Sequence, residues 1–584
     1  PYSHPGFESK ILPFKNRLYF MANAYKEPGD KSLGYELWVS DGTTEGTYLL
    51  KDIDDREGSP FVRNKVVHNN LLYFSADDGI HGHEVWRSDG TEEGTKLFFD
   101  VNPGINWSNA EEFHSVGDLL FFVADHQEYG QELWRSDGTI EGTHLLKDLT
   151  EGADNSTFDQ FNVVGDELFF HFGGHIWKSD GTEEGTMQLS NVPAAKSGFL
   201  DGSTLAIVNG VAFFVGYHDE FGSELWRTDG TAEDTRMVKD IYPGERDSQT
   251  NFLTESNGVL FFTAWDGSNG TELWRSDGTS EGTVMVRDIN TSFRHSTPTE
   301  LTDVDGTLFF TAHDPDHRRE LWKSDGTEEG TVLVKDIRPG TSKSEPRNLT
   351  NVDGTLLFTA NDGQHGYEFW KSDGTGDGTV LVKDIFPGES WSWPSEFTIV
   401  NGTFFFKASD SEDRMQVWRS DGTEKGTYLV ESAHPSINAN AYDLTPYNGQ
   451  LFFSMHTDFK KGELFSTGPA VYGSSGDDLI TINIGNRIRV SLNDQSYSFP
   501  LGEFTYVGSG GSDTIYVYGT AGDEKLVASP DSFEFTGSDF RINGLETSFL
   551  SVRGRGGNDE ATLFDSEGNE RVVAKLGNTF VRDL

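Results

Sequence analysis

Residues 320–327 read Glu320-Leu321-Trp322-Lys323-Ser324-Asp325-Gly326-Thr327, and close copies of this stretch recur along the first four fifths of the chain. The spacing between successive copies is 43 to 49 residues, and six of the eight intervals are 48. The repeated tryptophans are Trp38, Trp86, Trp134, Trp177, Trp226, Trp274, Trp322, Trp370 and Trp418. A tenth, divergent copy places Phe465 47 residues after the last of them. A sequence period of this length is typical of propeller and solenoid architectures.

The repeat at residues 345–388 predicts four short strands and no helix, because no apolar pattern of helical period is present. The strands are expected at 346–352, 355–360, 367–372 and 379–385, with turns at Asp353-Gly354, Asp373-Gly374 and Pro387-Gly388. Four antiparallel strands in roughly 40–50 residues, repeated in tandem, are typical of a β-propeller blade. The predicted fold class is therefore all-β, with a large propeller of about ten four-stranded repeats over residues 1–470.

The number of rings and their closure stay open at this stage. Repeat four is short and residues 192–203 are irregular, so one ring of ten repeats and two rings of five are both compatible with the pattern. We favour one ring because repeat five resumes the pattern without a linker. The last repeat lacks an obvious fourth strand. Either Pro469-Ala470-Val471-Tyr472 or an N-terminal segment is expected to supply it.

The composition excludes several classes of function. The 584 residues contain 46 Lys and Arg against 95 Asp and Glu, a net charge of −49, which repels nucleic acid and anionic membrane surfaces. The absence of cysteine excludes disulfides, thiolate catalysis and Cys-zinc sites. No apolar run is long enough to predict a membrane span. The chain does not begin with Met, and we expect it either to begin after processing or to be a fragment of a longer precursor.

The character of the sequence changes near residue 471. Tryptophan disappears, and Gly-Asp clusters begin at residues 473, 508, 519 and 554, with β-rich runs between them. Residues 471–584 therefore predict a second, smaller all-β domain of stacked or sandwiched strands.

The nine copies of Trp-x-(Ser or Thr)-Asp-Gly-Thr, seven of them preceded by Glu and an apolar residue, resemble the ELWxxDGT repeat family of bacterial extracellular proteins. Copies with His175 and Gln416 in place of Glu depart from that pattern. The resemblance implies a secreted or cell-surface propeller-like module and no particular activity. The Gly-Asp clusters are similar to the calcium-binding nonapeptide of secreted proteins. The tail around residues 561–569 resembles repeats of large bacterial surface proteins.

The third and fourth strands predict a recurring ion pair across their hairpin. If Ser324 and Thr331 face each other at the turn, Glu320 lies opposite Lys335. The same register pairs Glu36 with Lys51, Glu132 with Lys147, Glu224 with Lys239, Glu272 with Arg287 and Glu368 with Lys383. An exposed pair of this kind contributes roughly 0.2–1 kcal/mol, so we expect it to set the register more than the stability.

Three sets of residues in the repeat region are candidates for function. The recurring Asp of Ser-Asp-Gly-Thr, such as Asp325, is expected to open a turn by accepting backbone N–H bonds, with calcium in each turn as the alternative. The loop before each Glu-Leu-Trp varies between repeats and is acidic, which suits partner binding or calcium, with a merely solvated acidic rim as the alternative. The third set is the tryptophans outside the repeat pattern: Trp107, Trp265, Trp391 and Trp393.

The Gly-Asp clusters give the metal candidates, because glycine permits tight turns in which carbonyls and carboxylates face an ion. The candidate calcium ligands are Asp477, Asp478, Asp513, Asp523 and Asp559. The alternative is that these residues only make turns between stacked strands. No catalytic or cofactor-binding residue is predicted beyond this calcium.

The sequence thus favours a secreted or surface-displayed structural and binding protein that is not an enzyme and belongs to a larger extracellular assembly. Its partners are expected to be proteins, copies of itself or polysaccharide, without nucleic acid or membrane insertion. One alternative is a carbohydrate-active hydrolase or lyase that uses the propeller channel or rim. A monomeric carbohydrate- or protein-binding adhesin is the other.

Overall fold

The computed structural model describes residues 10–583 except 26–31, 43–45, 55–59, 151–157, 174, 190–204, 232–233, 293–294, 341, 401–402, 411–414, 431–439, 457–462, 468–469, 473–477, 486–487, 494, 500–502, 508–512, 521–522, 530–531, 539, 546–548, 554–558, 565–570 and 577–579. Every regular element in these residues is a β-strand, and none is a helix that could cross a membrane.

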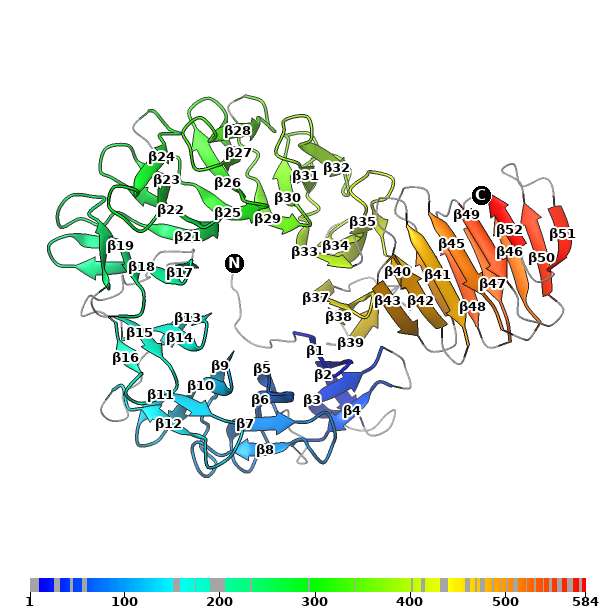
Figure 1. Cartoon of the computed structure of the whole chain (residues 1–584), viewed down its shortest axis with the longest axis horizontal. Coiled ribbons are helices and arrows are strands. Elements are labelled where there is room, and N and C mark those ends of the chain that lie inside the picture. Colours follow the sequence, from blue (N-terminus) through cyan, green and yellow to red (C-terminus); the bar gives the residue numbers. More distant parts are fainter. Residues whose placement is uncertain are drawn as a thin grey trace. The chain divides into compact units, whose positions relative to one another are not determined.

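Nine four-stranded sheets and one three-stranded sheet correspond to the ten sequence repeats in the described residues (Figure 1). Their strands are β1 (Leu12–Phe14), β2 (Arg17–Tyr25), β3 (Ser32–Ser40), β4 (Tyr48–Lys51); β5 (Arg63–His68), β6 (Leu71–Asp77), β7 (His83–Ser88), β8 (Lys96–Phe99); β9 (Glu111–Val116), β10 (Leu119–His126), β11 (Gly130–Ser136), β12 (His144–Lys147); β13 (Phe158–Val164), β14 (Glu167–Phe172), β15 (His175–Ser179), β16 (Met187–Gln188); β17 (Leu205–Val208), β18 (Val211–His218), β19 (Gly222–Thr228), β20 (Arg236–Lys239); β21 (Asn251–Ser256), β22 (Val259–Trp265), β23 (Thr271–Ser276), β24 (Val284–Arg287); β25 (Thr299–Val304), β26 (Thr307–Asp314), β27 (Arg318–Ser324), β28 (Val332–Lys335); β29 (Arg347–Val352), β30 (Thr355–Asn361), β31 (Tyr367–Ser372), β32 (Val380–Lys383); β33 (Ser395–Val400), β34 (Thr403–Ala408), β35 (Gln416–Ser420), β36 (Tyr428–Leu429); and β37 (Asn440–Tyr447), β38 (Gln450–His456), β39 (Glu463–Ser466).

The strand order in each sheet follows the chain, as a β-propeller blade requires. Consecutive sheets contact each other through their first strands, as β21 contacts β25. The four strands predicted for residues 345–388 are confirmed by β29 to β32, whose bounds differ from the predicted ones by a few residues at most. The chain is therefore an all-β protein built from propeller-type repeats.

The chain divides into two compact units. The first comprises Pro1–Gln364 with Ser372–Thr379, and the second comprises His365–Lys371 with Val380–Leu584. This division passes through the eighth sheet. The boundary expected near residue 470 falls where the last repeat strand, β39, is followed by β40 (Ala470–Tyr472), which belongs to a different sheet.

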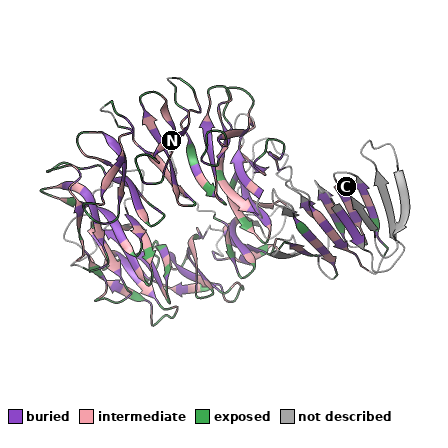
Figure 2. Cartoon of the chain, turned by 45° about the horizontal axis from the view of Figure 1, so that its top comes forward, coloured by how far each residue is buried: buried purple, intermediate pink, exposed green. Residues whose placement is uncertain are grey.

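The repeated tryptophan packs one sheet against the previous one. Trp86, 5% exposed, lies in a core cluster with Met21, Leu37 and Val39 of the preceding sheet. Its ring also stacks on Phe74 of the neighbouring strand, with 6.5 Å between centroids. Large apolar side chains thus fill the space between sheets, where the strands are mostly buried (Figure 2).

The predicted cross-strand ion pair is wrong, because each of the six hairpins for which it was predicted contains a β-bulge. The predicted register holds next to the turn, where Trp322 faces Leu333. It shifts by one residue after the tryptophan, so that Leu321, and not Glu320, faces Lys335. A bulge of this kind moves side chains from one face of the strand to the other. The glutamate therefore points to a different environment from the lysine.

The lysines join neighbouring sheets instead. Lys335 Nζ donates hydrogen bonds to the carbonyl oxygens of Gly376 and Thr379, at 3.0 and 2.7 Å, in the turn of the next repeat. Lys239 reaches Ser280 and Thr283 in the same way. Each lysine thus stabilises the carbonyl end of the following turn.

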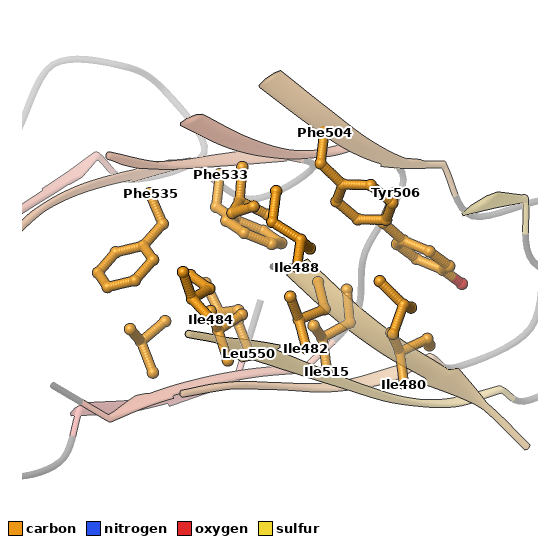
Figure 3. Packing of buried hydrophobic residues seen from close by; sticks show 14 of the residues in the cluster. Ile480, Ile482, Ile484, Ile488, Phe504, Tyr506, Ile515, Phe533, Phe535 and Leu550 are labelled. Atoms are coloured by element: carbon orange, nitrogen blue, oxygen red, sulfur yellow. The ribbon is translucent and has the colours of Figure 1, made fainter. Parts of the chain in front are cut away.

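The second domain consists of two sheets that face each other. Their strands are β40 (Ala470–Tyr472), β41 (Leu479–Ile484), β42 (Ile488–Leu492), β43 (Gln495–Phe499), β44 (Glu503–Val507), β45 (Thr514–Tyr518), β46 (Lys525–Ser529), β47 (Ser532–Thr536), β48 (Arg541–Leu545), β49 (Phe549–Arg553), β50 (Asp559–Phe564), β51 (Arg571–Leu576) and β52 (Phe580–Asp583). One sheet has seven strands in the order β40-β44-β48-β47-β46-β50-β51, and the other six in the order β43-β42-β41-β45-β49-β52. Ile482, Ile515, Phe504 and Phe533 lie in the core between the sheets (Figure 3).

The segment Ala470–Tyr472 does not complete the tenth repeat. It forms β40, whose Ala470 pairs with Thr505 of β44 in a parallel ladder of the second domain. The expectation that this segment supplies the missing fourth strand is therefore wrong. Its Val471 and Tyr472 continue the same ladder, and the described tenth repeat has only the three strands β37 to β39.

Candidate functional site

The glutamate of Glu-Leu-Trp is a buried clamp on the loop that follows the fourth strand. Glu320 is fully buried and accepts hydrogen bonds from the backbone N–H groups of Ile337 and Ser344, both at 3.0 Å. The Ser344 hydroxyl is 2.5 Å from its second oxygen. Ile337 and Ser344 lie at the two ends of the loop between β28 and β29. The Glu320 side chain therefore fixes both ends of this loop, which we call the clamped loop.

The same clamp recurs along the chain. Glu272 binds Ile289 and Ser296 with the same geometry, and Glu368 binds Ile385 and Ser392. The glutamates fully buried in this role, each accepting the backbone N–H seventeen residues on, are Glu36, Glu84, Glu132, Glu224, Glu272, Glu320 and Glu368. The clamp was not predicted, although a signal for it exists. A serine stands 24 residues after the glutamate at Ser108, Ser248, Ser296, Ser344 and Ser392.

Burial raises the pKa of these carboxyl groups, because a charged carboxylate loses its hydration there. The pKa of Glu320 is raised to about 7 and that of Glu368 to about 8, although the hydrogen bonds from serine and backbone oppose the shift. A raised carboxyl pKa is also found in catalytic acids. Here the carboxyl groups are closed off by the loops that they bind, and they recur in repeat after repeat, so their role is structural.

The clamped loop presents a position that changes from repeat to repeat. In five of the clamped loops, those of repeats two and five to eight, the residue just before the buried serine is Trp107, Asp247, His295, Lys343 and Trp391. The residue just after the serine has a left-handed backbone in each case, with φ between 41° and 53° at Asn109, Gln249, Thr297, Glu345 and Trp393. Strained non-glycine residues in loops on a rigid scaffold are a feature of binding sites.

The loop before Glu-Leu-Trp was predicted to bind a partner or calcium. In the structure, its carboxylates accept hydrogen bonds from residues of the same loop. Asp78 accepts the backbone N–H groups of Ile80 and His81, both at 2.8 Å, and contacts the His81 ring at 2.7 Å. Asp314 and His317 repeat this arrangement, with 2.9 Å between carboxylate and ring. These carboxylates therefore already have protein donors, which a calcium ion would have to replace.

The Asp of Ser-Asp-Gly-Thr opens a turn, as predicted. Asp325 Oδ1 accepts the Thr327 backbone N–H at 2.8 Å and its hydroxyl at 2.7 Å. Ser324 and Thr331 face each other at 2.7 Å, also as predicted. Gly330 closes the turn against the same carboxylate, since a Cβ there would lie 2.0 Å from Asp325 Oδ1.

Two tryptophans of the clamped loops are half exposed. Trp107 is 49% exposed and lies 6.0 Å from the His83 ring, and Trp391 is 51% exposed. Trp393 stacks on Tyr367 with 4.5 Å between ring centroids. Trp265 packs edge-on against Tyr242 at 5.0 Å. Of the four tryptophans singled out from the sequence, Trp107 and Trp391 are thus the ones that offer an open face.

The structure brings two of the predicted metal residues together. Asp513 Oδ1 accepts the Asp478 backbone N–H at 3.1 Å, and Asp513 Oδ2 accepts the Tyr506 hydroxyl at 2.7 Å. Asp478 itself binds the Asn493 side chain at 2.9 Å. Asp523 is exposed, Asp477 lies outside the described residues, and so does the side chain of Asp559.

This donor set is short of a calcium shell, which needs six to eight oxygens. In the described part of the chain, no three His, Cys, Asp or Glu side chains gather closely enough to hold a metal ion. Asp478 and Asp513 are both buried, and each has a carboxylate oxygen that accepts a protein hydrogen bond. Calcium binding at these residues stays a prediction.

Comparison with known proteins gives similarity of architecture only. No protein-family model and no curated protein matches the chain. Solved structures that resemble it include the computationally designed Ika8 protein, with 17% identity and a TM-score of 0.29 over 62% of this chain and 96% of that one. The β-propeller domain of the Trilobed protease from Pyrococcus furiosus has 10% identity and a TM-score of 0.28 over 62% and 95%.

A puromycin-hydrolyzing peptidase from Mycobacterium tuberculosis has 12% identity and a TM-score of 0.28 over 65% of this chain and 62% of its own length. The chain thus aligns with less than two thirds of that peptidase. TM-scores this low carry no argument about activity. The propeller architecture rests on the strand order described above, and the function must be argued from the loops.

Proposed function

We propose that this chain is a secreted or cell-surface structural and binding protein in which the propeller repeats hold loops out to partners. The observation that supports the proposal is the clamped loop, whose ends are fixed by a buried glutamate while its outer residue varies. Preorganised loops of this kind lose little entropy on binding. The partners are other proteins or copies of the chain, with polysaccharide as a further ligand class. Binding to these partners builds an extracellular assembly.

Exposed aromatic residues favour binding over a purely scaffolding role. Trp107 and Trp391 are each about half exposed, and tryptophan is enriched among the residues that dominate interfaces. The proposal includes no catalytic activity, because the carboxyl groups with the most strongly raised pKa values are closed off inside the repeats. An enzyme would need a singular carboxylate pair open to substrate.

The test compares the purified chain with a Trp107→Ala, Trp391→Ala double variant by sedimentation velocity, and surface labelling of intact source cells tests location. We expect the wild-type chain to be labelled on cells and to form assemblies, and the double variant to associate about tenfold more weakly or worse. Ile140→Ala is the matched control, because Ile140 is also exposed but lies in a Ser-Asp-Gly-Thr turn. The proposal is contradicted if the purified chain sediments as a monomer and the chain in intact cells is not labelled.

Calcium in the second domain is a separate part of the proposal, supported by the adjacency of Asp478 and Asp513 on neighbouring Gly-Asp turns. We expect calcium to raise the melting temperature and a chelator to lower it, because an ion that binds only the folded state stabilises it. An Asp478→Asn, Asp513→Asn variant should lose the calcium response. A melting temperature that ignores both calcium and chelator contradicts calcium binding.

A further inference from the structure

A basic pocket lies among the loops of the seventh repeat, within the first unit. Its volume is about 430 Å³, and it is lined by His313, Arg318, Arg338, Ser342 and Lys343. His313 is the last but one residue of β26 and Arg318 is the first of β27, while the other three belong to the clamped loop between β28 and β29. The pocket therefore lies where the two variable loops of one repeat meet.

Arg318 occupies a position that is glycine in the other regular repeats. Two residues before the clamp glutamate, these repeats carry a glycine with φ between 69° and 83°: Gly82, Gly130, Gly222, Gly270 and Gly366. Arg318 adopts the same left-handed backbone, with a φ of 66°. An L-residue with a side chain is disfavoured there. The other repeats form the same fold with glycine at this position, so the fold does not require the strained arginine of the seventh repeat.

The replaced glycine also explains why a pocket is present in this repeat. A Cβ on Gly82 would lie 2.5 Å from Asn106 O, and one on Gly366 would lie 1.7 Å from Ser390 O, so the clamped loop of those repeats packs directly on the glycine. The residue equivalent to Asn106 and Ser390 is Ser342. With Arg318 in place of glycine this close packing is excluded, and the space between Arg318 and Ser342 belongs to the pocket.

The charge of the pocket is opposite to that of the protein. Three of its five lining residues are cationic in a chain with a net charge of −49. Lys343 forms an ion pair with Glu345, which also binds Arg347. Among the described residues, neither Arg318 nor Arg338 has a carboxylate within ion-pair distance.

The acid groups that stand within a few residues of the two arginines in the sequence, Asp314, Asp316 and Asp336, all lie outside the pocket lining. Asp314 is buried and holds His317 and its own loop, and Asp316 is exposed in that loop. His313 has a pKa lowered by burial and by Arg318 and Arg319, so its ring is neutral at neutral pH and can donate one hydrogen bond. Two guanidinium groups, an ammonium group, a hydroxyl and a neutral imidazole thus line one pocket.

We propose that this pocket binds an acidic sugar, through the carboxylate or sulfate group of an anionic polysaccharide. Guanidinium groups match planar or tetrahedral oxyanions with paired hydrogen bonds. A volume of about 430 Å³ is larger than a lone ion needs and lies at the small end of ligand pockets, which suits one or two sugar units. The net charge of −49 opposes every long polyanion, nucleic acid and acidic polysaccharide alike, so we expect recognition to be confined to the one or two acidic units that enter the pocket. This inference rests on the proposed binding function and names a ligand class for it.

The test is titration calorimetry of the full chain with a sulfated heparin hexasaccharide and a galacturonate hexamer. Maltohexaose serves as the neutral probe. We expect at least one acidic probe to bind, maltohexaose to bind at least tenfold more weakly, and salt to weaken the binding. Arg338→Gln should reduce affinity about tenfold or more, as the loss of a charged hydrogen bond does. Arg63→Gln, an exposed arginine of another repeat, should leave affinity unchanged.

Arg318→Gly is the most informative variant, because it restores the residue of the other repeats. It should abolish binding and leave the melting temperature equal or higher, so that loss of binding cannot be ascribed to unfolding. Unchanged affinity in Arg318→Gly and Arg338→Gln overturns the inference. So does equal binding of inorganic sulfate alone, or tighter binding of a polyglutamate peptide.

The two proposals can fail separately. Trp107 and Trp391 lie outside the pocket lining, so their alanine variants should keep the affinity for the acidic hexasaccharide. If assembly and surface display are absent while the arginine-dependent binding remains, the proposed function fails and the pocket stands. If assembly depends on the tryptophans while neither acidic hexasaccharide binds, only the pocket assignment fails.

Discussion

At the scale of single residues, the recurring glutamate changes its role between sequence and structure. Its spacing from a lysine suggested an exposed ion pair, but Glu320 is fully buried and bound to backbone and serine donors. The pairing arithmetic assumed an unbroken ladder, and one bulged residue invalidates it beyond Trp322. A bulge leaves no clear mark in these sequences. The serine 24 residues after the glutamate was the visible clue.

Replacing Glu320 with glutamine tests the clamp. The amide can accept hydrogen bonds with only one of its two polar atoms, so a buried N–H of Ile337 or Ser344 loses its acceptor. We expect the free energy of unfolding to fall by about 1–3 kcal/mol, measured by urea denaturation. Glu328→Gln, an exposed glutamate of the neighbouring turn, should change it by less than about 0.5 kcal/mol. Equal effects of the two substitutions would refute the clamp.

At the scale of elements, the strands were predictable and their side-chain partners were not. Alternation and Asp-Gly turns located β29 to β32 to within a few residues. The lysine at the end of the fourth strand was assigned to its own hairpin, whereas Lys335 bonds to the turn of the next repeat. Sequence periodicity describes one repeat at a time. It carries no direct information about how side chains reach across to the adjacent sheet.

Lys335→Ala should loosen the junction between two neighbouring sheets. The substitution removes hydrogen bonds to the carbonyl oxygens of Gly376 and Thr379. Because the lysine is partly exposed, we expect a loss of only about 1 kcal/mol, together with faster amide exchange in residues 373–379. Lys96→Ala, an exposed lysine of the second repeat, is the control. Unaltered exchange in that turn would mean that the lysine does not hold it.

At the scale of the whole molecule, the repeat period identified the architecture, and a second period was overlooked. The Gly-Asp clusters at 473 and 508, and those at 519 and 554, are each 35 residues apart. The structure pairs strands at this spacing in parallel, as Leu479 with Thr514 and Lys525 with Glu560. A nine-residue calcium-binding pattern requires consecutive copies, whereas a 35-residue spacing places equivalent strands side by side in one sheet.

The candidate sites were predictable only in part. The half-exposed Trp107 and Trp391 were singled out because they stand outside the repeat. The basic pocket was not foreseen, although Arg318 breaks a column of glycines that can be read from the sequence. A repeat protein is most informative where one copy departs from the others. The arginine can be interpreted only with the structure, which shows that the clamped loop packs directly on the glycine of the other repeats.

The buried glutamates together predict how stability depends on pH. In the unfolded chain they ionise near their ordinary pKa of 4.5, whereas in the folded chain several keep their proton up to about pH 7 to 8. The folded state therefore binds more protons over this range, so its stability is fully present below the unfolded pKa and is lost as pH rises through the folded one. We expect the melting temperature to fall by several degrees between about pH 6 and pH 9.

Histidines such as His81, whose pKa is raised by Asp78, also titrate in this range, so the wild-type curve alone does not identify the glutamates. Glu320→Gln separates them, because it removes one titrating carboxyl group and no histidine. Its stability deficit relative to wild type should shrink as pH rises, since only the wild-type chain then has to bury a charge at that position. A deficit that stays constant from about pH 6 to pH 9 would mean that Glu320 is ionised throughout, and that its hydrogen bonds outweigh the cost of burial.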